Sequence, residues 1–128
     1  MMAELIAGIL GLIRKKNFTE AKEIIDRSYQ NFLKNDASFF QRIPKEKLTE
    51  ELLEKHNYTR GHLQILAELF FAEAEVLYAR EFKKEALQYY EKSLLLFNYV
   101  LKETKTFSLE EQNRISSIQQ KIDELNSK

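Results

Sequence analysis

The chain has 128 residues, enough for one domain with a sizeable core. Its 20 Lys and Arg balance 20 Asp and Glu, so it lacks the cationic surplus that nucleic-acid or anionic-membrane binding requires. The sequence contains no Cys, which excludes disulfides, thiolate metal sites and cysteine nucleophiles and is compatible with the cytoplasmic localisation that we expect.

Helices dominate the predicted fold, because the chain has one Pro, three Gly and no alternating β-branched segment. The first helix, before Lys16, spreads six aliphatic side chains over roughly 160° and is expected to bury two faces. A signal peptide is not indicated, since Glu4 precedes the apolar run and the basic cluster follows it. The run is also far shorter than the about 20 residues that span a bilayer, so no membrane insertion is expected. A membrane-surface anchor and a dimer contact remain the alternatives for its surplus apolar width.

A second helix is predicted from about residue 19 to 34, and its pattern returns 65 residues later in a fourth helix, about 83–102. The aligned pairs preserve small, polar and aromatic positions: Ala21 with Ala86, Ser28 with Ser93, and Phe32 with Phe97. A constant offset of this kind indicates a duplicated supersecondary unit rather than general helix composition.

Between the two units, residues 36–58 break the repeat. Asp36 is suited to cap a short helix that carries Phe39 and Phe40, and Pro44 suits the first turn of a following Leu-rich helix. Exposing both phenylalanines would create an apolar patch. We therefore expect this insertion to pack against the first helix pair.

The C-terminal half predicts three helices with clear start signals. Thr59 is expected to cap the third helix, 60–80, which is apolar on more than one face. Ser108, with Glu111 three residues later, predicts a capping box for a fifth helix, about 109–126. The apolar residues of this last helix form a narrow seam, typical of a lid with one solvated side: Ile115, Ile118, Ile122 and Leu125.

The two helix pairs resemble the tetratricopeptide repeat. The matching positions are Phe70, Ala74, Leu77, Ala86, Tyr90 and Ser93 in the second pair and Leu5, Leu12, Ala21, Ile25 and Ser28 in the first, where Gly8 and Ile9 invert the usual order of large and small residues. The chain also resembles a group of uncharacterised bacterial helical proteins with the same layout. The resemblance implies one all-α domain, residues 1–128, with antiparallel helix pairs at about 3–34 and 60–102 stacked as a short divergent array. The insertion at 36–58 and a C-terminal capping helix at 109–126 would complete this domain.

The sequence predicts no reaction chemistry. The only two imidazoles, His56 and His62, are six residues apart and are expected to be exposed or in a cap region. Carboxylates on the third helix lack the partner histidines of a di-iron site, and no Gly-rich phosphate loop is present. We therefore expect no catalytic residue, no metal and no cofactor.

The favoured function is protein–protein interaction in a groove lined by the first and third helices. Aromatic and acidic positions there suit a basic or amphipathic protein or peptide. The expected partner-binding residues are Ile6, Leu10, Arg14, Glu68, Phe71, Glu75 and Tyr78. Two alternatives remain open for this groove, which is either exposed or filled by residues 36–58. A self-associating homodimer is the main alternative function, ahead of an enzyme or a small-ligand binder.

Overall fold

The computed structural model describes residues 2–104 and 108–127, where all regular structure is helical, so the predicted all-α class is confirmed for these residues. The five long helices are α1 (Met2–Arg14), α2 (Phe18–Leu33), α5 (Arg60–Ala79), α6 (Lys83–Thr104) and α7 (Leu109–Asn126). The insertion contains α3 (Ala37–Gln41), followed by η1 (Lys45–Lys47), α4 (Leu48–Glu50) and η2 (Glu51–Lys55).

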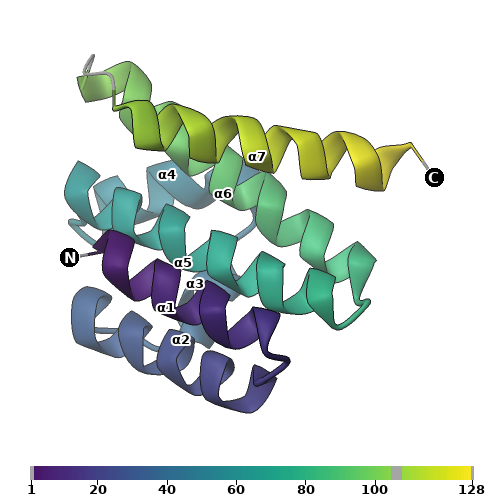
Figure 1. Cartoon of the computed structure of the whole chain (residues 1–128). Helices are drawn as coiled ribbons and strands as arrows, with labels where there is room; N and C mark the ends of the chain where they lie inside the picture. The colour runs from purple at the N-terminus through teal and green to yellow at the C-terminus, as the bar shows by residue number, and fades with distance from the viewer. Residues whose placement is uncertain (1, 105–107, 128) are drawn as a thin grey trace.

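The long helices form two antiparallel pairs with α7 laid along the second pair. Figure 1 shows α1 and α5 next to each other, α2 at one edge of the molecule and α7 at the opposite edge. α1, α5 and α7 run in the same direction, while α2 and α6 run back. The first helix of each pair and α7 therefore share one side of the array.

The turns inside the two helix pairs have the same backbone geometry. Lys16 and Glu81, 65 residues apart, both adopt left-handed conformations, with φ of 63° and 70°. Each turn is closed by an equivalent hydrogen bond of 2.8 Å, from Asn17 N to Leu12 O and from Phe82 N to Leu77 O. The repeat visible in the sequence thus extends to the way in which each pair is folded.

Asp36, Thr59 and Ser108 each cap a helix as predicted, but the return bond of the capping box expected from the Glu111 side chain is not formed. Asp36 and Ser108 accept hydrogen bonds from backbone N–H groups three residues later, at 3.0 and 3.3 Å. Thr59 caps α5, and the side chain that completes its capping box is His62, whose Nδ1 accepts from Thr59 N at 3.0 Å. This histidine therefore has a structural role in the cap region.

α1 departs from the expectation that it buries two faces. Only Ile6 and Ile9 are buried, although α1 contacts both α2 and α5. On the outer side, a Cβ added to Gly8 would meet no atom within 4 Å. The remaining aliphatic residues are half-buried at the flanks: Leu5, Leu10, Leu12 and Ile13.

The insertion packs against both helix pairs rather than the first alone, through an aromatic stack on α2 and a buried carboxylate of α5. The Phe40 ring stacks on Tyr29 of α2 with 5.8 Å between ring centroids. Glu73 of α5 is 3% exposed and accepts hydrogen bonds from Lys22 Nζ (2.9 Å), Tyr29 Oη (3.2 Å) and Gln41 Nε2 (3.0 Å). The insertion thus covers the side of α5 that carries Glu73, in agreement with its position behind α5 in Figure 1.

We predict that Ala86→Leu lowers the free energy of unfolding by about 1–3 kcal/mol, because Ala86 is fully buried between the helices of the second pair and cannot accommodate a larger side chain. The matched control is Ala79→Leu, at an exposed position, which is expected to be near neutral. Urea unfolding of both variants measures the difference. Equal stabilities would show that close helix contact at Ala86 is unimportant.

We also predict that Tyr29→Phe destabilises the fold by about 1–2 kcal/mol, because it removes one donor from the buried Glu73 carboxylate while keeping the aromatic stack. Asp26→Asn changes only an exposed partner of Lys22, and its effect should stay within about 0.5 kcal/mol. Thermal melts of the two variants test this contrast. A melt of Tyr29→Phe identical to that of the parent would rule out a stabilising role for the hydroxyl.

Candidate functional site

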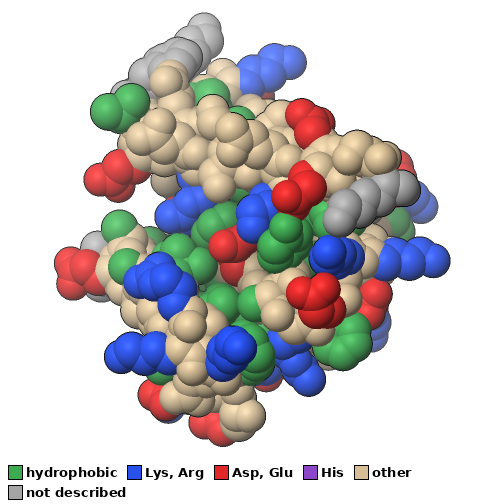
Figure 2. Space-filling model, turned by 45° about the vertical axis from the view of Figure 1, so that its right-hand side comes forward, with side chains coloured by type: hydrophobic (Ala, Val, Ile, Leu, Met, Phe, Trp, Pro, Cys, Tyr) green, Lys and Arg blue, Asp and Glu red, His purple; other side chains and the backbone are tan. Residues whose placement is uncertain are grey.

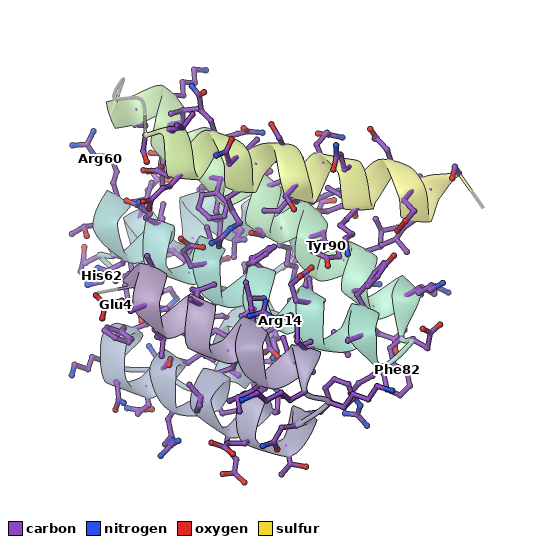
Figure 3. The ribbon with its side chains drawn as sticks, in the orientation of Figure 1. Glu4, Arg14, Arg60, His62, Phe82 and Tyr90 are labelled. Atoms are coloured by element: carbon purple, nitrogen blue, oxygen red, sulfur yellow. The ribbon has the colours of Figure 1, made fainter. Side chains whose placement is uncertain are left out.

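The predicted binding residues on α1 differ in their solvent exposure. Ile6 is fully buried, because it faces α2 and α5 together with Ile9, so the expectation that it contacts a partner is corrected. Leu10 is half-buried, and Arg14 is exposed at the C-terminal end of α1 (Figure 3). A Cβ added to Gly11 would lie 3.8 Å from Arg14 Nη2, so this guanidinium runs back along its own helix.

The predicted residues on α5 form a single stripe, Glu68, Phe71, Glu75 and Tyr78, which we call the α5 stripe. α7 covers it with two cations. Arg114 Cζ lies 4.3 Å from the ring centre of Phe71, and Lys121 Nζ lies 3.7 Å from that of Tyr78. Neither alternative from the sequence therefore holds. The stripe is not open, and α7, rather than residues 36–58, covers it, because the insertion lies on the Glu73 side of α5.

Carboxylates strengthen both of these contacts. Arg114 forms an ion pair with Glu68, and Lys121 Nζ lies 4.0 Å from Glu75 Oε2. Burial raises the pKa of the Glu68 carboxyl, while the Arg114 guanidinium opposes this rise. The α5 stripe therefore holds each cation by an aromatic face and a carboxylate together.

Two tyrosines complete the layer between α5 and α7. Tyr90 projects from α6, lies below α7 in the view of Figure 3, and donates a hydrogen bond to Glu75. Burial and the Glu75 charge raise the pKa of Tyr90, so its hydroxyl stays protonated as a donor. The Tyr78 ring lies 6.5 Å from that of Tyr90, and its hydroxyl donates to Glu124. These bonds fix the carboxylates and aromatic rings in place beneath the cations.

One end of this layer is an open cavity of about 160 Å³, which we call the acidic mouth. It lies where the N-terminal ends of α1, α5 and α7 meet, and three carboxylates face one guanidinium there. Its lining residues are Met2, Ala3, Gln64, Glu68, Ser108, Glu110, Glu111 and Arg114. In Figure 2 a furrow separates the α7 layer from the body below, with charged side chains of both signs along it. This charge balance favours a cationic ligand at the mouth.

A larger cavity of about 460 Å³ lies at the turn after α1, but its cations outnumber its carboxylates, since Lys16, Lys22 and Arg80 face Glu23 and Asp26. Burial lowers the pKa of Lys92, but the cavity that it lines with Gln41, Gln88 and Tyr89 has a volume of only about 60 Å³. That space holds about two water molecules. In residues 2–104 and 108–127, no three His, Cys, Asp or Glu side chains are placed to hold a metal ion. The same residues contain no helix with the length and apolarity needed to cross a membrane.

Sequence reasoning missed the residues that α7 contributes. The sequence pattern gives Glu110, Arg114 and Lys121 no role beyond the charged side of the last helix, and it gives Glu111 a role only in a capping box. The available signal was the seven-residue spacing of the two cations, which places them two turns apart on one face of a helix. Charge complementarity with the α5 stripe would have suggested the pairing.

Comparison with known proteins adds no relative to this description. Neither a protein-family model, nor a curated protein, nor a solved structure matches the chain. The candidate site is therefore argued from its own geometry.

We predict that Arg114→Glu lowers the free energy of unfolding by about 1–3 kcal/mol, because a carboxylate would replace the hydrogen-bonded cation beside Glu68. Adding Glu68→Lys to the same chain should restore part of the loss by reversing the pair. Asn113→Glu introduces a charge at an exposed neighbouring position and serves as the control. Thermal unfolding measures all three, and the absence of rescue would count against a specific ion pair.

Proposed function

We propose that this chain is a non-enzymatic helical-repeat adaptor that binds a basic or amphipathic segment of another protein. The observation that carries the proposal is the α5 stripe, which already holds two cationic side chains of a helix through aromatic faces and carboxylates. The duplicated helix pairs and the resemblance to tetratricopeptide repeats support a scaffold of the peptide-binding kind. Fold-level analogy alone would leave the binding surface unspecified.

The acidic mouth is the accessible part of this surface. Glu110 is exposed and Glu111 is half-buried, so both can meet a Lys or Arg side chain without rearrangement of the fold. Opposite charges at a mouth steer an incoming segment and make its capture dependent on salt. A segment anchored there would continue along the furrow between α1 and α7.

A displayed library of helical peptides, selected on the purified chain, tests this proposal. We expect the selected sequences to be enriched in Lys and Arg on one face, and their affinity to fall as salt rises. The variant Glu110→Gln with Glu111→Gln should lose about two- to thirtyfold in affinity, since each exposed charge contact contributes about 0.2–1 kcal/mol. Loss of these two first-turn carboxylates should lower the free energy of unfolding by about 2 kcal/mol or less. Enrichment of acidic peptides, or no enrichment, would contradict the proposal.

A homodimer is the second candidate, favoured by a separate observation on α1. Leu5, Leu10, Leu12 and Ile13 are only half-buried, and the space outside Gly8 is open. A second copy would bury these flanks by close approach of the two α1 helices. Sedimentation at several concentrations tests this candidate, and a monomer throughout the range would rule it out.

A further inference from the structure

α7 has the chemistry that the proposed function assigns to the partner. Arg114 and Lys121 lie two turns apart on one side of the helix, and both contact the α5 stripe. The buried residues Ile118 and Ile122 lie beside them and supply the apolar anchor. α7 is therefore an amphipathic helix with a basic edge, bound to an aromatic and acidic surface of its own chain.

The attachment of α7 is limited compared with that of the central helix. α7 buries two of its 18 residues, whereas α5 buries ten of 20. The buried Ile118 and Ile122 stabilise the docked helix, and the cost of ordering the helix offsets part of this gain. Leu109, at the start of α7, is 73% exposed and adds little. α7 is thus suited to detach locally while the helix pairs stay folded.

Detachment of α7 would uncover the α5 stripe and open the mouth, because Ser108, Glu110, Glu111 and Arg114 would leave with the helix. Glu68 belongs to both, since it lines the mouth and pairs with Arg114. Phe71, now 4% exposed, would become accessible beside it, followed by Glu75 and Tyr78 along the same side of α5. The result would be a groove along α5 in which acidic and aromatic residues alternate from Glu68 to Tyr78.

The geometry points to α7 as a built-in competitor for the binding site, so that the partner is a helix that replaces α7 on the α5 stripe. This inference rests on the proposed function and specifies its partner. The chemistry of the occupant is that of α7, with two cations seven residues apart and two aliphatic residues beside them. A partner of this kind would make with the stripe the contacts that α7 makes, whereas Glu110 and Glu111 of the mouth would leave with α7.

The test uses a fluorescent peptide with the sequence of residues 108–127 and the full chain. In the release variant, Ile118→Asp with Ile122→Asp, the chain's own α7 loses its buried anchor. We expect this variant to bind the peptide at least tenfold more tightly than the parent chain does. A peptide with Arg114→Glu and Lys121→Glu should bind neither chain, and Glu68→Lys added to the release variant should abolish capture of the native peptide.

Hydrogen exchange on the unmodified chain gives an independent readout that does not require the release variant to fold. We expect the slowest amides of α7 to exchange through an opening reaction of lower free energy than that of the slowest amides of α5. Equal protection of α7 and α5 would overturn the inference, because α7 would then leave only when the whole fold opens. Equal peptide affinities of the parent and the release variant would overturn it too. Basic peptides captured through Glu110 and Glu111 would still support the proposed function in either case.

Discussion

The central constraint of this structure is that α5 is apolar on almost every side and must be covered by several helices. Ten of its 20 residues are buried, and among them is the carboxylate Glu73. No single neighbour can enclose such a helix, because each helix contact covers only one stripe of its surface. α1, α2 and α6 therefore surround it, the insertion seals the Glu73 side, and α7 occupies what remains.

Two kinds of covering are used on opposite sides of α5, and they differ in chemistry. On the insertion side, Glu73 is removed from water and receives three hydrogen bonds, which fix Gln41 and Tyr29 in one arrangement. On the α7 side, cations lie over aromatic rings, and the carboxylates that pair with them remain partly solvated. The first arrangement is costly to break because it would leave a buried charge unpaired. If a partner helix replaced α7 as proposed, the rings and carboxylates of the second arrangement would meet an equivalent cationic ligand.

Local features of this fold are predictable from the sequence, and long-range pairings are not. The caps Asp36, Thr59 and Ser108 act within three residues, so residue type and spacing were enough to identify them. The repeat offset correctly aligned the turns at Lys16 and Glu81, because both turns are closed by bonds between near neighbours in the chain.

The candidate site was predictable in part for the same reason. The α5 stripe lies on one helix, so its acidic and aromatic character followed from helical periodicity. The helix that covers the stripe could not be predicted in this way, since Arg114 is 46 residues from Glu68. The insertion was an equally apolar candidate because of Phe39 and Phe40. Ile6 was misassigned because periodicity shows which residues share a face, but not which face meets α2 and α5. The wide apolar arc of α1 likewise did not predict how much of the helix is buried, since only Ile6 and Ile9 are buried.

The common direction of α1, α5 and α7 has a consequence for the polarity of any bound helix (Figure 1). Parallel neighbours place the positive ends of their dipoles together, at the end of the array where the mouth lies. Glu4, Glu110 and Glu111, in the first turns of α1 and α7, offset this positive potential. α7 has no choice of direction, because the chain reaches it from the end of α6. A separate helix is free of that constraint, and the dipoles favour its binding in the reverse direction, with its C-terminus at the N-terminal ends of α1 and α5.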